Sequence, residues 1–389
     1  MNQANQTYLF RTANRIVAGR HSLGRVGEHL PMSGTFRSAL IFTGSSMVRL
    51  GYIDELKQAL DRRGIFAEVT TGIDNEPTVD HLEEWNRKIS GGGFDLFIGV
   101  GGGSILDAVK ILSVLQTNGK SIREMIGTNL VEKPGIPTVL VPTTSGTGSE
   151  VTPNAIVTFP EEELKLAVVS DYLLPLLTVI DPVLTLSLPR QITAATGMDA
   201  FTHSFESYIS NKANPFSNLF AIESMKLIAR SIVRSYEDGA SLDAREDMLL
   251  GSMYGGLALT ASGTAAVHAL AYPLGGKFHI AHGVANAMLL PHVTRVNMDS
   301  IFHRMPEIAA AIGLNTSSLS AERAAELVME QIFAWTQTLS IPQNLAEYGV
   351  GEKDLDGLTE AALKVKRLLD NNPKVLGFED IKGIYRKLL

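Results

Sequence analysis

The first half of the chain alternates short β-type runs with segments of helical periodicity, and this alternation constrains the fold more than any other feature. Strands are predicted at Ser38–Thr43, Phe66–Thr70, Phe94–Val100 and Pro137–Pro142, with further β-type runs at Ala155–Phe159, Leu164–Val169 and Leu177–Ile180. Helical patterns lie between the early strands, at Met47–Arg63, Val79–Ile89 and Ser104–Leu115. Such alternation favours a parallel sheet covered by helices on both faces.

Beyond Asp181-Pro182 the pattern changes to long segments of helical periodicity. Examples are Ile192–Tyr208, Ser217–Ser235 and Ala321–Thr338. The 389 residues, of which 45% are hydrophobic, are enough for two cores of ordinary size. We therefore expect an α/β domain over residues 1–185 and an all-α domain over residues 186–389.

Charge and residue usage exclude several classes of function. There are 34 basic and 41 acidic residues and no long basic run, so nucleic acid and anionic membrane are poor candidate partners. The absence of cysteine excludes disulfides, thiolate metal ligands and cysteine nucleophiles. No apolar run reaches the roughly 18–20 residues of a membrane span, and the first twenty residues do not resemble a signal peptide. A cytoplasmic protein is expected.

A glycine-rich loop follows the strand predicted at Phe94–Val100. Gly101, Gly102 and Gly103 precede Ser104 and the start of a helix that includes Asp107. Glycines allow a phosphate to approach the backbone, and the free N–H groups at a helix N-terminus favour an anion. The loop could equally be a tight turn without a ligand, because it is not the usual G-x-G-x-x-G fingerprint.

A second loop of small polar residues, Pro142–Glu150, follows the strand predicted at Pro137–Pro142. Its hydroxyl and N–H groups could line the cleft at the carboxyl ends of the strands, where open α/β sheets bind ligands. Alone it could be an ordinary connection. Two such loops after two strands favour a nucleotide site.

One aspartate and three histidines in the second half could bind a metal ion. Asp199 and His203 are four residues apart on a predicted helix, so they project from one face. His268 and His282 follow, and the Pro273–Gly276 segment between them can break the helix so that both point into one cavity. Three imidazoles and a carboxylate suit Fe(II), Zn(II) or Mn(II). Each histidine could instead be a separate polar residue of the surface or core.

Four segments resemble the signature segments of the iron-dependent (group III) alcohol dehydrogenases, and the resemblance extends from about Phe36 into the C-terminal helices. The segments are GGGSILD, PTTSGTGSEVTPNAIVT, AATGMDAFTHSFESYIS and HALAYPLGGKFHIAHGVANAMLLPH. The resemblance implies a Rossmann-like α/β domain and a helical domain in the two-domain arrangement of dehydroquinate synthase. It also implies an NAD- or NADP-dependent enzyme that acts on a small alcohol, aldehyde or hydroxy acid and forms a homo-oligomer.

The resemblance also assigns roles to individual positions. It makes Asp199, His203, His268 and His282 the ligands of Fe(II), or of Zn(II) as in some members. The residues that it implies for cofactor binding are Gly44, Ser45, Glu76, Gly101, Gly102, Gly103, Ser104, Asp107, Thr143, Thr144, Thr147, Ser149, Asn154, Lys165 and Thr185.

Three positions depart from the family pattern. Gly44, followed by Ser45, stands where many NAD-preferring relatives have an aspartate, so we expect NADP(H) to be tolerated. Tyr272 replaces a histidine often assigned to proton transfer, and His279 could substitute for it or be a surface residue. The segment LALTASGTAA before His268 lacks a frequent asparagine, so the substrate pocket should differ.

Two other functions remain open from the sequence. One is a lyase of the dehydroquinate synthase type, which uses NAD transiently and binds zinc. The other is a non-catalytic nucleotide-binding relative. Lys277, between the last two histidines, could meet an anionic substrate group or be a solvated surface lysine.

Overall fold

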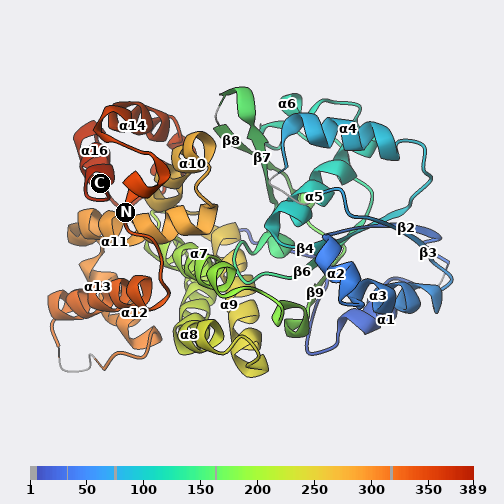
Figure 1. The fold of residues 1–389 in the computed structure, drawn as a ribbon, viewed down its shortest axis with the longest axis horizontal. Coiled ribbons are helices and arrows are strands. Elements are labelled where there is room, and N and C mark those ends of the chain that lie inside the picture. Colours follow the sequence, from blue (N-terminus) through green and yellow to red (C-terminus); the bar gives the residue numbers. More distant parts are fainter. Residues whose placement is uncertain (1–6, 33, 74–76, 163, 316–318) are drawn as a thin grey trace.

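One half of the protein is built on a six-stranded parallel sheet. The computed structural model describes residues 7–32, 34–73, 77–162, 164–315 and 319–389 (Figure 1). The strand order is β1-β9-β6-β4-β2-β3, and every pair of neighbours is parallel. The strands are β1 (Ile16–Ala18), β2 (Ser38–Thr43), β3 (Phe66–Thr70), β4 (Leu96–Gly101), β6 (Thr138–Pro142) and β9 (Leu177–Ile180).

Helices cover both faces of this sheet, and strand β2 shows why. Its residues alternate between two cores: Ala39 and Ile41 belong to one, and Leu40 and Phe42 to the other. Because side chains alternate across a strand, a strand buried on both faces reads as a continuous apolar run such as SALIFT. Figure 1 shows α1–α3 on one side of the sheet and α4 and α5 on the other. The helices of this half are α1 (Val26–His29), α2 (Ser45–Arg49), α3 (Tyr52–Asp61), α4 (Val79–Ile89), α5 (Gly103–Asn118) and α6 (Ile122–Met125).

The helix predicted over Met47–Arg63 is wrong as a single element. Gly51 has a φ of +80° and separates α2 from α3. Glycine adopts this left-handed conformation without the steric cost of a Cβ, so the chain turns there although the apolar periodicity continues.

A second, smaller sheet lies beside α5. Its order is β5-β8-β7, in which β7 (Asn154–Phe159) and β8 (Leu164–Val169) are antiparallel and β5 (Gly127–Thr128) is parallel to β8. Ala155 and Val157 of β7 share a core with α5. The β-type runs at 155–159 and 164–169 therefore belong to a hairpin outside the main sheet.

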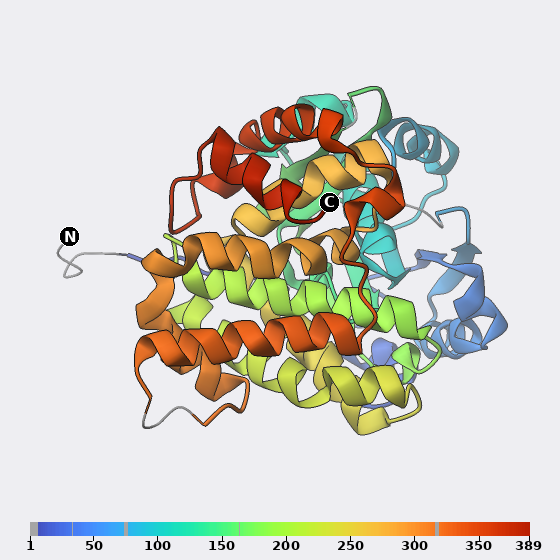
Figure 2. The ribbon, with the colours of Figure 1, turned by 60° about the vertical axis from the view of Figure 1, so that its left-hand side comes forward.

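The other half of the protein is helical among the described residues, as predicted. Figure 2 shows its long helices lying side by side around a single core. The α-helices are α7 (Arg190–Ile209), α8 (Pro215–Glu237), α9 (Leu242–Ser262), α10 (Ala266–Phe278), α11 (His282–Ile301), α12 (Met305–Ala311), α13 (Ala321–Thr338), α14 (Leu355–Leu363), α15 (Lys366–Leu369) and α16 (Phe378–Arg386). Within the described chain, none of the helices is both long and apolar enough to span a membrane.

The change from strands to helices falls between Ile180, where β9 ends, and Arg190, where α7 begins. A small apolar cluster joins the two halves there, with Val151 and Ile180 on one side and Leu249, Met253 and Leu257 of α9 on the other. The loop after β6 packs against the helical half, since a Cβ on Gly146 would come within 2.8 Å of Thr196 on α7, and the turn after β4 packs against Thr147 of that loop. The loops that follow these strands therefore lie beside the helical half.

Candidate active site

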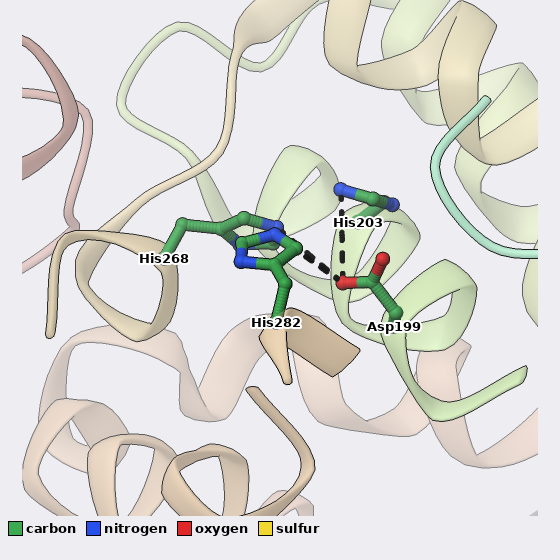
Figure 3. Close-up of side chains that lie close together, drawn as sticks. All are labelled: Asp199, His203, His268 and His282. Atoms are coloured by element: carbon green, nitrogen blue, oxygen red, sulfur yellow. Dashed lines mark ion pairs between the residues drawn. The ribbon is translucent and has the colours of Figure 1, made fainter. Parts of the chain in front are cut away.

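Three separate helices bring Asp199, His203, His268 and His282 together. Asp199 and His203 lie on α7, His268 on α10, and His282 is the first residue of α11. One potential ligand atom from each side chain lies within 4.8 Å of the others. Figure 3 shows the carboxylate and the three imidazoles pointing toward one another. Asp199 Oδ1 lies 3.8 Å from Nε2 of His268 and of His282, and 3.9 Å from Nε2 of His203.

Burial and neighbouring groups together favour the protonation states that a metal requires. Burial lowers the pKa of His203 to about 4 and that of His282 to about 3, so both imidazoles are neutral near pH 7. Burial alone would raise the pKa of Asp199, but the neighbouring histidines and an amide lower it overall. The site therefore offers lone pairs and a carboxylate, as metal coordination demands.

Hydrogen bonds orient two of the imidazoles through Nδ1, the ring nitrogen that faces away from the other ligands. His268 Nδ1 lies 2.6 Å from Glu206 Oε2, and His203 Nδ1 lies 3.2 Å from the carbonyl oxygen of Gly146. Each contact leaves Nε2 free to face the site. Glu206 also accepts from the backbone N–H groups of Ala265 and Val267, at 2.9 and 2.6 Å, so its position is fixed. A carboxylate behind a metal-binding histidine is a recurrent arrangement in metal sites.

The amide of Asn286 shows how strongly the acceptor atoms converge. Its Nδ2 donates to Asp199 Oδ1 at 2.6 Å and lies 3.1 and 3.2 Å from Nε2 of His268 and of His282. Its Oδ1 is buried without a hydrogen-bond partner. A single positively polarised group thus faces three acceptors at once, which is the environment that a cation would find.

Glu206→Gln is expected to weaken metal binding about 10- to 100-fold, because neutral glutamine orients and polarises His268 less strongly. The dissociation constant measured by competition with a chelator tests this. Glu223→Gln on α8 is the matched control, since Glu223 is partly exposed and, among the described residues, forms an ion pair with Lys226 at 3.3 Å. An unchanged metal affinity in Glu206→Gln would contradict the orienting role.

The break between His268 and His282 lies elsewhere than predicted. Helix α10 continues through Pro273 to Phe278, and the chain turns at His279, whose φ is +55°. Proline removes one backbone donor but leaves its neighbours free to continue the helix, so the glycines after it do not end α10. Both histidines nevertheless face one site, as predicted.

The glycine-rich loop forms the turn between β4 and α5. A Cβ on Gly101 would come within 2.5 Å of Ile105, and one on Gly103 within 2.6 Å of Thr147. Gly102 precedes the first turn of α5 and accepts hydrogen bonds from the N–H groups of Ile105 and Leu106. The loop therefore packs closely against Thr147 and presents the N-terminus of α5 to the adjoining cleft.

A buried network braces the two loops. Asp107 accepts from the hydroxyl of Ser149 at 2.5 Å and from the backbone N–H of Ile156 at 3.0 Å. Lys110 donates to Ser149 Oγ at 2.9 Å and to the carbonyl oxygen of Asn154 at 2.7 Å. Burial lowers the pKa of Lys110 to about 8 and raises the pKa of Asp107. Asp107 and Ser149 thus already form hydrogen bonds within the protein, which leaves them fewer for a bound cofactor.

A cleft of about 420 Å³ joins the glycine-rich loop to the histidines. The three histidines of the candidate metal site line it, together with several residues predicted to bind the cofactor. These lining residues are Gly103, Ser104, Asp107, Thr147, Ser149, Asn154, Lys165, His203, His268, Tyr272 and His282. The two halves of the predicted site therefore share one cavity.

Not every predicted cofactor residue that the structure describes lines this cleft. Thr143 and Thr144 follow β6, while Gly44 and Ser45 follow β2, so all four stand at the carboxyl edge of the sheet with Gly101 and Gly102. Thr185 is fully buried, and its hydroxyl donates to the carbonyl oxygen of Pro182 at 2.8 Å. Glu76 lies outside the described residues.

Of the residues considered for proton transfer and anion binding, one lines the cleft and two do not. Tyr272 lines the cleft, with its ring centroid 6.0 Å from that of His282, and burial raises the pKa of its hydroxyl. His279 is exposed and does not line the cleft. Lys277 is exposed, lies outside the lining and pairs with Asp354 at 3.3 Å.

Sequence reasoning missed Glu206, Gly146 and Asn286. A periodic signal for two of them was present: Glu206 lies seven residues after Asp199 on the same helix face, and Asn286 lies four residues after His282. Gly146 acts through its backbone carbonyl, which no side-chain pattern reveals.

Comparisons with known proteins agree with this geometry. The family model described as "Iron-containing alcohol dehydrogenase" matches residues 13–182, and "Fe-containing alcohol dehydrogenase family, C-terminal" matches residues 193–389. Long-chain-alcohol dehydrogenase 1 of Geobacillus thermodenitrificans is 42% identical over 89% of this chain and 88% of its own length. The 1,3-propanediol dehydrogenase of Citrobacter freundii is 35% identical over 95% of each chain.

A solved structure of 1,3-propanediol oxidoreductase has a TM-score of 0.94 and 33% identity, covering 99% of this chain and 100% of that one. The likeness thus spans both halves and the cleft between them. This chain belongs to the iron-containing alcohol dehydrogenase family.

Proposed function

We propose that the protein is a metal-dependent oxidoreductase that transfers hydride between NAD(P) and a small alcohol or aldehyde. The observation that carries the proposal is the shared cleft, which is lined both by the three histidines of the Asp199 cluster and by Gly103 and Ser104 at the N-terminus of α5. A hydride-transfer enzyme needs its cofactor and the reacting oxygen of its substrate in one enclosed space.

The donor set fits a divalent metal ion. One carboxylate and three imidazoles, two of them with strongly lowered pKa, match the ligand preferences of Fe(II) and Zn(II). Family membership favours Fe(II). When bound, the ion would act as a Lewis acid on the oxygen of the substrate.

The chain would contribute positioning and water exclusion. Gly103 and Ser104 would hold the cofactor pyrophosphate at the N-terminus of α5, where backbone N–H groups and the helix dipole favour an anion. Lys165 lies in the cleft beside α10, where a Cβ on Gly275 would come within 3.3 Å of its Nζ. From there it would orient the cofactor toward His282.

Tyr272 is proposed as a hydrogen-bond donor rather than a base. Because burial raises the pKa of its hydroxyl, the side chain stays protonated near neutral pH. It would orient the substrate oxygen or a water molecule in the cleft. The exposed position of His279 gives no support to a proton-transfer role for that residue.

Gly44→Asp is expected to lower kcat/KM for NADPH about 10- to 100-fold more than for NADH, because a carboxylate there would repel a 2′-phosphate. Gly44 has φ −83° and ψ 152° and precedes α2, so aspartate fits both the backbone and the N-cap. Gly44→Asn is the neutral control of the same shape. Equal losses with both cofactors would overturn this proposal and the tolerance of NADP(H).

The reaction can be tested with a panel of primary alcohols, diols, hydroxy acids and their aldehydes. Printed names of relatives include long-chain-alcohol and 1,3-propanediol dehydrogenases, so these alcohols belong in the panel. We expect net oxidation of NADH or NADPH with at least one aldehyde. A lyase of the dehydroquinate synthase type would show no net change in NAD(P)H, and a non-catalytic relative would show none either. That result would reject the dehydrogenase.

Assembly into a homo-oligomer and a cytoplasmic location are proposed from family resemblance. Light scattering after size-exclusion chromatography tests the first: a mass of 42.0 kDa would indicate a monomer and contradict it.

A further inference from the structure

The helical wall of the cleft is built from three segments that are tied together. The backbone N–H of Asn211 donates to the carbonyl oxygen of Asn371 at 2.8 Å, and Asn371 Nδ2 donates to the carbonyl oxygen of Thr264 at 2.8 Å. The segment after α7, the loop after α9 and the end of α15 are thereby joined. Lys212, Thr264, Arg367 and Asn371 from these segments all line the cleft.

This wall carries two uncompensated positive charges. Lys212 and Arg367 are exposed, and neither forms an ion pair with any residue that the structure describes. Among the described lining residues the only carboxylate is that of Asp107, which is already bonded to Ser149 and Ile156. The cleft therefore has positive charge that no residue in the described part of the chain neutralises.

Arg367 approaches the reacting end of the cleft through the packing of two helices. It lies on α15, which packs against α10, the helix that carries His268 and Tyr272, and both Arg367 and Tyr272 line the cleft. Tyr272 in turn contacts His282 through its ring. A molecule with one end at the histidines and the other at Arg367 would pass along Tyr272.

The cofactor phosphates do not account for these charges. The glycine-rich N-terminus of α5 belongs to the α/β half, whereas Lys212 and Arg367 belong to the helical half. The two positive groups thus line the cleft from a different half of the protein than the proposed pyrophosphate site.

We infer that this wall recognises an anionic group of the substrate, such as a carboxylate distal to the reacting carbonyl, with Arg367 as principal partner and Lys212 as second. The inference rests on the proposed dehydrogenase function. A guanidinium can bind a carboxylate through two parallel hydrogen bonds, which also fixes its orientation. The substrate class is then an ω-oxo acid and the corresponding ω-hydroxy acid.

The test compares butanal with 4-oxobutanoate, which has the same number of carbons and a terminal carboxylate. In the wild-type holoenzyme we expect kcat/KM to be at least about tenfold higher for 4-oxobutanoate, and this preference to fall with added salt. Arg367→Ala should lower kcat/KM for 4-oxobutanoate about 10- to 100-fold through KM and change that for butanal less than threefold. Arg367→Lys should fall between, and the control Lys277→Ala should change neither.

The outcomes separate this inference from the proposed function. If the wild type oxidises NAD(P)H with no aldehyde of the full panel, the dehydrogenase itself fails. If it reduces both probe aldehydes equally well and Arg367→Ala changes neither, only the anionic substrate fails. A rise in KM for the cofactor with both aldehydes would assign Arg367 to the cofactor and would also overturn the inference.

Discussion

Replacing His268 by alanine is expected to abolish stable metal binding and to lower kcat/KM for aldehyde reduction by at least about a thousandfold. His268 provides one of four converging ligand atoms, and its loss leaves three. It also removes the imidazole that partners the buried carboxylate of Glu206 at 2.6 Å. A Lewis acid supplies several kcal/mol of transition-state stabilisation, and each 1.4 kcal/mol is a factor of ten in rate.

Metal content per chain and steady-state rates, measured on the same preparation, test this expectation. His303→Ala is the matched control because His303 is exposed and lies outside the cleft. Circular dichroism establishes that both variants fold. A His268→Ala protein that retains a full equivalent of metal, or wild-type activity, would contradict the assignment of this ligand.

Gly103→Val is expected to raise the dissociation constant of the cofactor about 10- to 100-fold while leaving metal content unchanged. A Cβ at this position would lie 2.6 Å from Thr147 Cγ2 and 2.8 Å from its Oγ1. Thr147 is short and branched, so the clash must move the loop rather than a flexible side-chain end. The added side chain would also separate the N-terminus of α5 from a phosphate.

Quenching of protein fluorescence by NADH or NADPH gives the dissociation constant directly. Gly383→Ala is the control, since a Cβ on this helical glycine of α16 meets nothing within 4 Å. Cofactor affinity close to that of the wild type in Gly103→Val would show that the pyrophosphate binds elsewhere. A loss of metal in this variant would instead indicate a general disturbance of the cleft.

The sequence predicts much of the α/β half because local patterns determine it. The continuous apolar run at Ser38–Thr43 follows from burial of both faces of β2, and the run at Leu177–Ile180 has the same cause. Where a single residue overrides periodicity the prediction fails, as at Gly51 between α2 and α3. At Pro273 the reverse occurs, because the surrounding helix continues despite a residue that usually disrupts it.

The candidate site, too, could be predicted from the sequence only in part. The spacing of Asp199 and His203 on one helix face can be read from the chain, but their meeting with His268 and His282 depends on how α7, α10 and α11 pack. That packing is tertiary, so only family resemblance made it predictable. Contacts made through the backbone, such as the one from Gly146 to His203, and the bracing of Asp107 by Ser149 required the structure.

The most direct test of the central claim is removal and restoration of the metal in the wild-type protein. After chelation and buffer exchange, NAD(P)H oxidation is measured with the best aldehyde of the panel, before and after addition of Fe(II) or Zn(II). We expect activity to disappear with the metal and to return as one equivalent per chain binds. Full turnover in protein shown to be metal-free would contradict the proposal that Asp199, His203, His268 and His282 form a catalytic metal site.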